Sequence, residues 1–414
     1  MNMEQASSKE LLAYWQAHLD ERARSHKKEG KLVCWSAALA PTEMFIAMDI
    51  AMVFPETHSA GIGARKGALD MLEVTNRDGY SIDICSYARV NLGYMRLLKE
   101  YARTGEKAEA LAKSPAADVP LPDLILTSNN ICNTLLKWYE NLAVELDIPC
   151  ITIDAPYIHD MPVPEYSKKY IVKQLDHAIQ QLEGITGRPF DYDRFLAAQE
   201  QTQRSVKQWQ RVASFLNYKP SPINGFDFFN YMALMVIGRG EEFAEIALRK
   251  FADELEENAK NGKFAFGDNE RSRVVWEGIA VWPHLSHTFK SLKNQGSLMT
   301  GSTYPGMWNF EYTPGDLMSM AESYAKIYVN MCLDARAQEL TAVAKNGRCD
   351  GMLFHMNRSC KIMSLLNLQT AEIVSKTLGI PYATFDGDQT DPNNFSPAQF
   401  DTRVQSLSEM IAKK

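Results

Sequence analysis

The chain has 414 residues, of which 45% are hydrophobic and 23% are charged, and its mean hydropathy is -0.28. These values exclude a largely disordered chain and allow about two or three hydrophobic cores. The net charge is -7, and the basic residues are spread along the chain, which argues against a nucleic-acid surface. Small molecules or other proteins are therefore the expected partners.

No membrane segment is expected. The most apolar stretch, residues 231–237, is far shorter than the roughly 20 residues that cross a bilayer. The N-terminal residues 1–5 are polar and lack the apolar core of a secretion signal. We therefore expect a cytoplasmic protein.

The N-terminal part predicts a helix followed by an α/β unit. Leu11, Trp15 and Leu19 recur at helical spacing and predict an amphipathic helix within the first 30 residues. A short strand is expected directly after it. Further along the chain, a strand, a helix and a second strand form a βαβ unit, at residues 124–126, 135–146 and 150–153.

The same unit recurs near the C-terminus. A strand, a loop, a helix and a second strand are expected there, at residues 350–354, 357–360, 364–378 and 382–385. Residues 146–150 resemble residues 378–382, and the loop of each copy holds one cysteine, Cys132 or Cys360. Two related halves are therefore predicted.

Helical periodicity dominates the segment between the halves, at residues 167–184, 192–216 and 228–262. Two more strands, 274–282 and 297–304, are expected in the second half, with a helical turn at residues 287–293 between them. The predicted fold class is α/β, with two flavodoxin-like parallel-sheet domains related by an internal repeat and joined by a helical connector. The expected units are residues 1–160, residues 161–260 and residues 261–414.

Three of the seven cysteines share a sequence context. Cys85, Cys132 and Cys360 each follow a short apolar run, for Cys85 the strand-like residues 80–84, and each precedes a helical pattern. The carboxyl ends of parallel strands are where ligands bind. Three thiolates at such ends could hold an iron–sulfur cluster, whereas a single one is more often a buried packing residue.

The other cysteines lack this context. Cys150 lies inside a strand, Cys332 lies in a helical run and Cys349 precedes the second unit, so all three are expected to be packing residues. Cys34 stands at a strand end and could reach a central site. The same turn carries Ser36, whose hydroxyl could hydrogen-bond a ligand bound to a cluster.

Residues 54–67 are rich in glycine, yet neither a dinucleotide fingerprint nor a P-loop is present. A structural turn remains one interpretation. A site for a phosphate of coenzyme A, with Glu56 or His58 as an acid–base group, remains the other.

Two further segments are ambiguous. The acidic loop at residues 386–392 has the character of a structural turn more than of a magnesium site. The aromatic residues of segment 276–284 could line a pocket or fill the core.

Together, several short motifs resemble the α subunits of 2-hydroxyacyl-CoA dehydratases, a family related to the benzoyl-CoA reductases. The motifs run in the same order over nearly the whole chain, at residues 34–36, 55–56, 80–89, 129–132, 137–140, 224–227, 357–361 and 386–389. Cys34 is a departure, because several members have glycine there, and this argues against Cys34 as an essential ligand.

The resemblance implies a [4Fe-4S] cluster held by Cys85, Cys132 and Cys360, with one iron left open. It places Ser36 and Glu56 near that iron, with Glu56 as the proton-transfer group. It also implies a heterodimer with a related β subunit, an ATP-dependent iron–sulfur activator protein that donates electrons, and an acyl-CoA substrate. A flavin elsewhere in the complex is compatible with the family, but none is predicted from this chain.

The implied reaction is the loss of water from an (R)-2-hydroxyacyl-CoA to give the 2-enoyl-CoA. The thioester carbonyl, bound at the open iron, takes up an electron and becomes a ketyl radical that expels the hydroxyl group. Thr57 and His58 resemble the lactoyl-CoA enzymes, which favours lactoyl-CoA as substrate. An electron-relay subunit and a benzoyl-CoA reductase-like subunit remain the alternatives.

Overall fold

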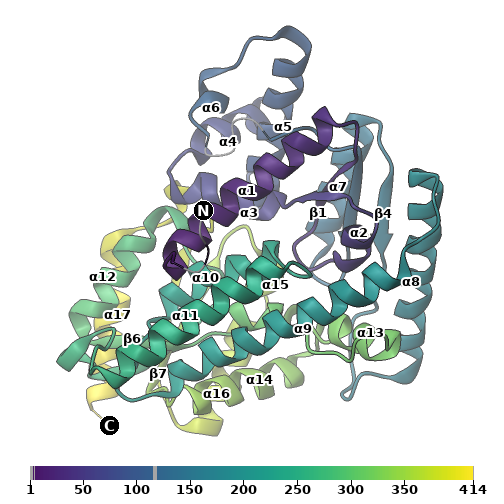
Figure 1. Ribbon diagram of the computed structural model, residues 1–414. Coiled ribbons are helices and arrows are strands. Elements are labelled where there is room, and N and C mark those ends of the chain that lie inside the picture. Colours follow the sequence, from purple (N-terminus) through teal and green to yellow (C-terminus); the bar gives the residue numbers. More distant parts are fainter. Residues whose placement is uncertain (1–2, 4, 115–118, 414) are drawn as a thin grey trace.

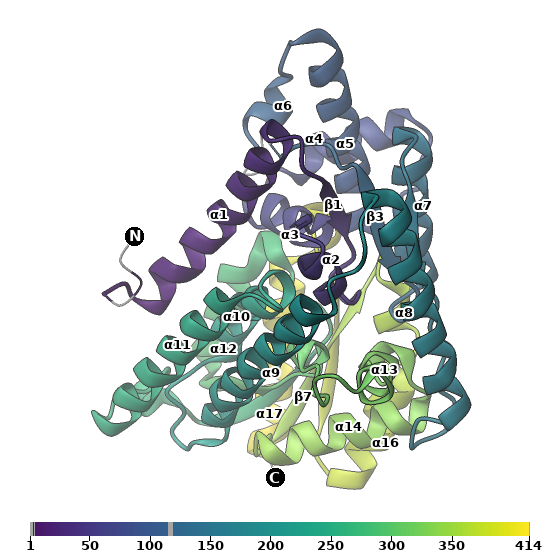
Figure 2. The same cartoon turned by 45° about the vertical axis from the view of Figure 1, so that its right-hand side comes forward.

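The chain folds around two separate parallel sheets (Figures 1 and 2). The computed structural model describes residue 3, residues 5–114 and residues 119–413, so residues 1, 2 and 4 of the polar N-terminus lie outside the described part. The first sheet has the order β2-β1-β3-β4. Its strands are β1 (Val33–Ser36), β2 (Ala51–Val53), β3 (Leu124–Ser128) and β4 (Cys150–Ile153).

The second sheet repeats this arrangement with the order β6-β5-β7-β8. Its strands are β5 (Ser272–Glu277), β6 (Ser297–Gly301), β7 (Gly351–Asn357) and β8 (Tyr382–Gly387). All neighbouring strands in both sheets are parallel. Numbered within each half, both orders read 2-1-3-4, as in flavodoxin-like folds. The predicted fold class and the internal repeat are confirmed.

The strand register shows which residues of the two repeated halves correspond to each other. Ser36 at the end of β1 pairs with Leu126, and Glu277 at the end of β5 pairs with Phe354. Each loop cysteine follows the paired residue of β3 or β7 by six positions. Ser36 and Glu277 therefore occupy equivalent places, as do the tryptophans that precede them.

Four long helices connect the two sheets. They are α8 (Glu165–Thr186), α9 (Tyr192–Ser214), α10 (Gly225–Ile237) and α11 (Glu242–Lys260), and α9 and α11 run side by side (Figures 1 and 2). The helical stretch predicted over residues 228–262 contains a glycine pair near Gly238, and the chain turns there, between α10 and α11. Gly240 has a φ of +76°, and a Cβ on Gly238 would lie 2.7 Å from the Cβ of Ala244. The expected division into residues 1–160, 161–260 and 261–414 remains a prediction.

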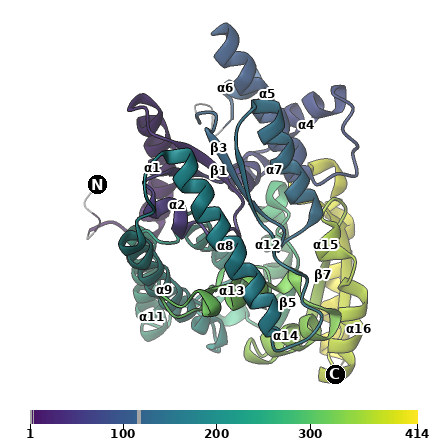
Figure 3. The same ribbon diagram turned by 90° about the vertical axis from the view of Figure 1, so that its right-hand side faces the viewer.

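The remaining helices pack against the sheets or against other helices, as α13 does against α8 (Figure 3). They are α1 (Ser8–Lys28), α2 (Glu43–Ala47), α3 (Pro55–Ala64), α4 (Ala68–Arg77), α5 (Ser86–Thr104), α6 (Glu109–Ala112), α7 (Asn133–Leu146), α12 (Leu285–Gln295), α13 (Leu317–Ala325), α14 (Leu333–Asn346), α15 (Lys361–Ser364), α16 (Asn367–Leu378) and α17 (Pro397–Ala412). In the described part of the chain, no helix combines the length and apolar character needed to cross a membrane.

Two local predictions around the site are wrong. Residues 80–84 form a loop instead of a strand. Ile82 is 57% exposed there, and the side chain of Ser81 accepts a hydrogen bond from the Asp83 backbone, which favours a turn. The glycine-rich segment forms helix α3 instead of a turn. Gly63 lets this helix approach the second half closely, because a Cβ there would lie 2.8 Å from the side chain of Thr390.

Several element boundaries also differ. The strand expected over residues 274–282 ends at Glu277, because Gly278 turns the chain with a φ of +109°. The strand expected over residues 297–304 ends at Gly301, and the helix expected over residues 364–378 is divided into α15 and α16. Cys332 caps the start of α14 instead of lying within a helix.

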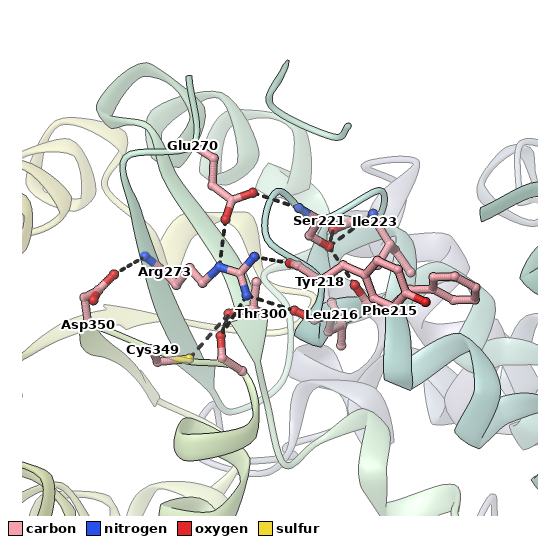
Figure 4. Close-up of polar contacts among 11 residues, drawn as sticks. Phe215, Leu216, Tyr218, Ser221, Ile223, Glu270, Arg273, Thr300, Cys349 and Asp350 are labelled. Carbon is pink, nitrogen blue, oxygen red and sulfur yellow. Dashed lines mark hydrogen bonds and ion pairs between the residues drawn. The ribbon is translucent and has the colours of Figure 1, made fainter. Parts of the chain in front are cut away.

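A buried arginine ties the connector to the second sheet (Figure 4). Arg273 is fully buried, and its Nε donates to Glu270 at 2.7 Å. Its Nη1 donates to the backbone carbonyls of Leu216 and Gly347, at 3.2 Å each. Cys349 lies beside this cluster, at the opposite end of β7 from Cys360, and burial raises the pKa of its thiol to about 12. This environment suits the predicted packing role.

Candidate active site

Three thiols from distant parts of the chain come together between the two sheets. Cys85, Cys132 and Cys360 each occupy the residue before a helix, namely α5, α7 and α15. The backbone N–H of Ser86, next to Cys85, donates to the hydroxyl of Ser359, next to Cys360, at 3.1 Å. Burial is the largest cause that raises the pKa of Cys85 and Cys360, and Cys132 adds to both shifts, which agrees with three neighbouring thiols. The repeat supplies two of these cysteines at equivalent strand ends, and the start of α5 supplies the third.

Burial away from water is the largest influence on the pKa values of these three thiols. Each residue keeps some exposed surface, but the surrounding protein raises the pKa of Cys132 to about 11, of Cys360 to about 12 and of Cys85 well above its ordinary value. Helix N-termini favour thiolates, and the Leu135 N–H donates to the Cys132 sulfur at 3.3 Å. Desolvation nevertheless outweighs these hydrogen bonds, so without a metal the thiols stay protonated at neutral pH.

The donor set suits a cluster better than a single ion. Within the described residues, no three His, Cys, Asp or Glu side chains are grouped to hold one metal ion. All seven cysteines are free of disulfides. An iron–sulfur cluster takes one thiolate on each of several iron atoms, so its ligands can stand further apart than those of one ion. Three converging soft ligands fit that requirement.

A buried carboxylate joins the segments of two of these cysteines. Asp388 follows β8 and accepts hydrogen bonds from the hydroxyls of Ser86 and Ser359, the latter at 2.6 Å. Ser86 follows Cys85 in the sequence, and Ser359 precedes Cys360. The backbone N–H groups of the two residues starting at Thr390 also donate to Asp388. These four protein donors match the structural interpretation of the acidic loop.

Glu56 lies in the first turn of α3 and has both carboxyl oxygens paired. Its Oε1 accepts the Ala38 N–H at 3.0 Å, and its Oε2 contacts the Tyr139 hydroxyl, which is also 3.0 Å from the Ser36 carbonyl. Burial raises the pKa of Glu56 against the lowering effect of these hydrogen bonds. One hydroxyl hydrogen cannot serve two acceptors. A protonated Glu56 that donates to Tyr139, which in turn donates to Ser36, satisfies all the groups.

The neighbouring sequence candidates have different environments. Ser36 is fully buried, and its hydroxyl donates to the Ala37 carbonyl at 3.1 Å. Cys34 is also fully buried, and its pKa is raised by burial and then by the nearby Cys150. Cys34 therefore interacts with another strand cysteine and not with the three converging thiols.

A cavity of about 450 Å³ lies beside this site, between α1, α3 and α10. Its volume falls in the range of small-molecule pockets. Glu56, Thr57 and His58 are among its polar lining residues, and His58 Nε2 lies 3.3 Å from Asp20 Oδ1. The rest of the lining is mainly apolar and aromatic. The motif at the start of α3 thus faces a space that could accept a ligand.

Aromatic residues connect the cavity with the thiols. Tyr304 lines the cavity, and Cys360, Glu56 and Cys85 all act with burial to raise the pKa of its hydroxyl. Tyr87, which also lines the cavity, accepts a hydrogen bond from the indole of Trp282. Of the aromatic segment left open by the sequence, Trp282 lines the cavity while Trp276 fills the core.

Sequence reasoning missed Tyr87, Tyr139 and Tyr304. The position of Tyr87 two residues after Cys85 is a usable signal. Tyr139 falls within the motif at residues 137–140, although only contacts across the fold show its role. No local pattern marks Tyr304.

Comparison with known proteins agrees with this arrangement. Residues 37–411 match the family described as 2-hydroxyglutaryl-CoA dehydratase, D-component. The chain is 60% identical to lactoyl-CoA dehydratase subunit alpha of Anaerotignum propionicum, over 98% of this chain and 96% of that protein. It is 40% identical to the (R)-2-hydroxyisocaproyl-CoA dehydratase alpha subunit of Clostridioides difficile, over 94% and 92%. A benzoyl-CoA reductase subunit of Thauera aromatica is 27% identical over 90% and 87%.

Identities of this size over nearly the whole chain define a dehydratase subunit of the hydro-lyase class. The chain belongs to the 2-hydroxyacyl-CoA dehydratase family, as its motifs predicted.

Proposed function

We propose that this chain is the α subunit of a 2-hydroxyacyl-CoA dehydratase that removes water from (R)-lactoyl-CoA by a radical elimination. The 60% identity to a lactoyl-CoA dehydratase subunit supports the substrate, as do Thr57 and His58 in the cavity lining. The relatives are named as subunits. A related β subunit, an ATP-dependent iron–sulfur activator protein and a cytoplasmic location complete the proposal.

Cys85, Cys132 and Cys360 would hold a [4Fe-4S] cluster with one iron free of protein thiolates. Support comes from their convergence and from the soft character of the donor set. When bound, the cluster would supply electron transfer and a Lewis-acidic iron for the thioester carbonyl. Binding would also deprotonate the three thiols, since a coordinated thiol loses its proton outright.

The residues around the cavity would bind the substrate, exclude water and transfer protons. The apolar and aromatic walls bind the acyl thioester and exclude water from it. Glu56 gives its proton to the departing hydroxyl group and, as the carboxylate, takes up the proton that leaves the β-carbon. Burial raises its pKa, which favours the protonated form at the start of this sequence. Tyr139 and the Ala38 N–H hold that carboxyl group in place. The backbone carbonyl of Ser36 accepts a hydrogen bond from the Tyr139 hydroxyl and so holds Tyr139 in place. The hydroxyl of Ser36 lies in the same turn.

The cavity is the observation that carries this proposal. A subunit that only relays electrons needs no space for a substrate next to its cluster. Here Tyr304 borders the cavity, and Cys360 and Cys85 act with burial to raise the pKa of its hydroxyl, which supports a thioester site beside these thiols. The same observation is compatible with a benzoyl-CoA reductase-like subunit, but identity to that relative is much lower, at 27%.

The test is an activity assay on the anaerobically reconstituted complex with its activator. The complex is offered a panel of (R)-2-hydroxyacyl-CoA thioesters that differ in chain length, together with benzoyl-CoA. We expect the highest kcat/KM for lactoyl-CoA and no reduction of benzoyl-CoA. A preference for a branched-chain thioester contradicts the substrate, and turnover of benzoyl-CoA alone contradicts the reaction.

A further inference from the structure

A buried amide touches one of the three thiols. Gln389 is fully buried in the loop after β8, and its Nε2 lies 3.2 Å from the sulfur of Cys85. Its Oε1 lies on the other side, 3.3 Å from the hydroxyl of Ser359. A cysteine sulfur bound to a metal can accept a hydrogen bond but cannot donate one. Metal binding therefore favours the orientation in which the amide nitrogen faces Cys85.

The surroundings hold this amide in place. The preceding residue, Asp388, is clamped by Ser86 and Ser359 and by two backbone N–H groups. Ser359 also accepts the Ser86 N–H at 3.1 Å. The loop after β8 is thereby fixed to the segments that carry Cys85 and Cys360. Because Gln389 is fully buried, bulk water does not compete for its hydrogen bond.

We propose that Gln389 raises the reduction potential of the cluster by donating an N–H···S hydrogen bond to Cys85. The inference rests on the proposed cluster. Reduction adds one negative charge to the cluster and its ligands, so a donor at a ligand sulfur stabilises the reduced form more than the oxidised form. The interaction is strong at this place, because the buried amide acts in a region of low dielectric constant.

The test replaces Gln389 with methionine, which has a similar length and no N–H group. The full chain is purified anaerobically, its iron and sulfide are measured, and the cluster is titrated at defined potentials by EPR spectroscopy. We expect Gln389→Met to keep about four iron atoms and to shift the one-electron reduction equilibrium about tenfold toward the oxidised form, which corresponds to 59 mV.

Thr390→Val is the matched control. Thr390 is buried in the same loop, its hydroxyl has no hydrogen-bond partner among the described residues, and valine keeps its methyl contact with α3. This variant should titrate like the wild type. If Gln389→Met fails to load iron, Gln389→Leu takes its place, because leucine also lacks an N–H group and carries no charge, so it should shift the equilibrium by a similar amount.

The outcomes separate the two proposals. A wild-type chain that binds no iron overturns the cluster itself, whatever Gln389 does. A loaded Gln389 variant that titrates at the wild-type potential overturns the role of Gln389 and leaves the cluster intact. An equal shift in Thr390→Val assigns the effect to the loop and likewise overturns the role of the amide.

Discussion

Replacing Glu56 with glutamine removes a proton-transfer group while keeping its shape. The amide oxygen can accept the Ala38 N–H as Oε1 does now, at 3.0 Å. The amide nitrogen can donate to Tyr139, as a protonated carboxyl does, and Tyr139 can still donate to the Ser36 carbonyl, 3.0 Å away. We therefore expect the variant to fold, to bind iron like the wild type and to accept electrons.

The effect on turnover is large. A positioned general acid or base contributes about two to four orders of magnitude to the rate, which corresponds to about 3–5 kcal/mol of activation free energy. The carboxyl group lines the cavity, and its charge adds to the effect of burial in raising the pKa of Cys132, so it lies beside the proposed cluster. We expect kcat of Glu56→Gln to fall about 100- to 10,000-fold.

The assay compares the initial rate of enoyl-CoA formation by wild type and variant at equal iron content, in the complex with activator. Equal iron content separates proton transfer from cluster loss. A Glu56→Gln enzyme that turns over within a few-fold of the wild type would show that the carboxyl group only caps or packs helix α3.

Three further experiments test the site and the core around it. Cys132→Ser should lose most of its iron while Cys349→Ser keeps it, and normal iron content in Cys132→Ser would rule out the ligand set. Asp388→Asn removes the negative charge that accepts hydrogen bonds from two serine hydroxyls. We expect it to lower the free energy of unfolding by about 1–3 kcal/mol and also to lower the iron content. An unchanged urea midpoint would show that Asp388 does not hold the two cysteine segments together. Burial raises the pKa of Glu277 to about 7, so the folded chain holds a proton that the unfolded chain releases near pH 4.5. This protonation contributes about 3 kcal/mol to the free energy of unfolding. The contribution is present below pH 4.5 and is lost as the pH rises to about 7. The urea midpoint should therefore fall less between pH 5 and 8 in Glu277→Gln than in the wild type. A slope that stays unchanged would refute this origin.

The sequence predicts the regular parts of this fold well. Buried runs such as residues 124–126 and the recurrence of residues 146–150 at 378–382 specify the strands and the repeat. Strand β2 is missed because it has only three residues, too few for a periodic pattern. The loop at residues 80–84 is misread because its apolar alternation matches a strand, although no neighbouring strand covers it.

The sequence likewise predicts only some of the residues of the candidate site. The three cysteines are found because each stands beside a strand-like run, even where that run is a loop. The partners of these residues are not found. Gln389 and Cys85 are 304 positions apart, and Tyr139 is 83 positions from Glu56, so only the folded chain brings them into contact.

The two sheets have the same strand order, but their crossover segments differ. Cys132 and Cys360 follow equivalent strands of the two halves and would be related by the duplication. The third thiol, Cys85, comes from the crossover between β2 and β3, whereas the matching crossover between β6 and β7 contributes Tyr304. Divergence of the two crossovers thus accounts for a site with a thiol from one crossover and a tyrosine of the cavity lining from the other.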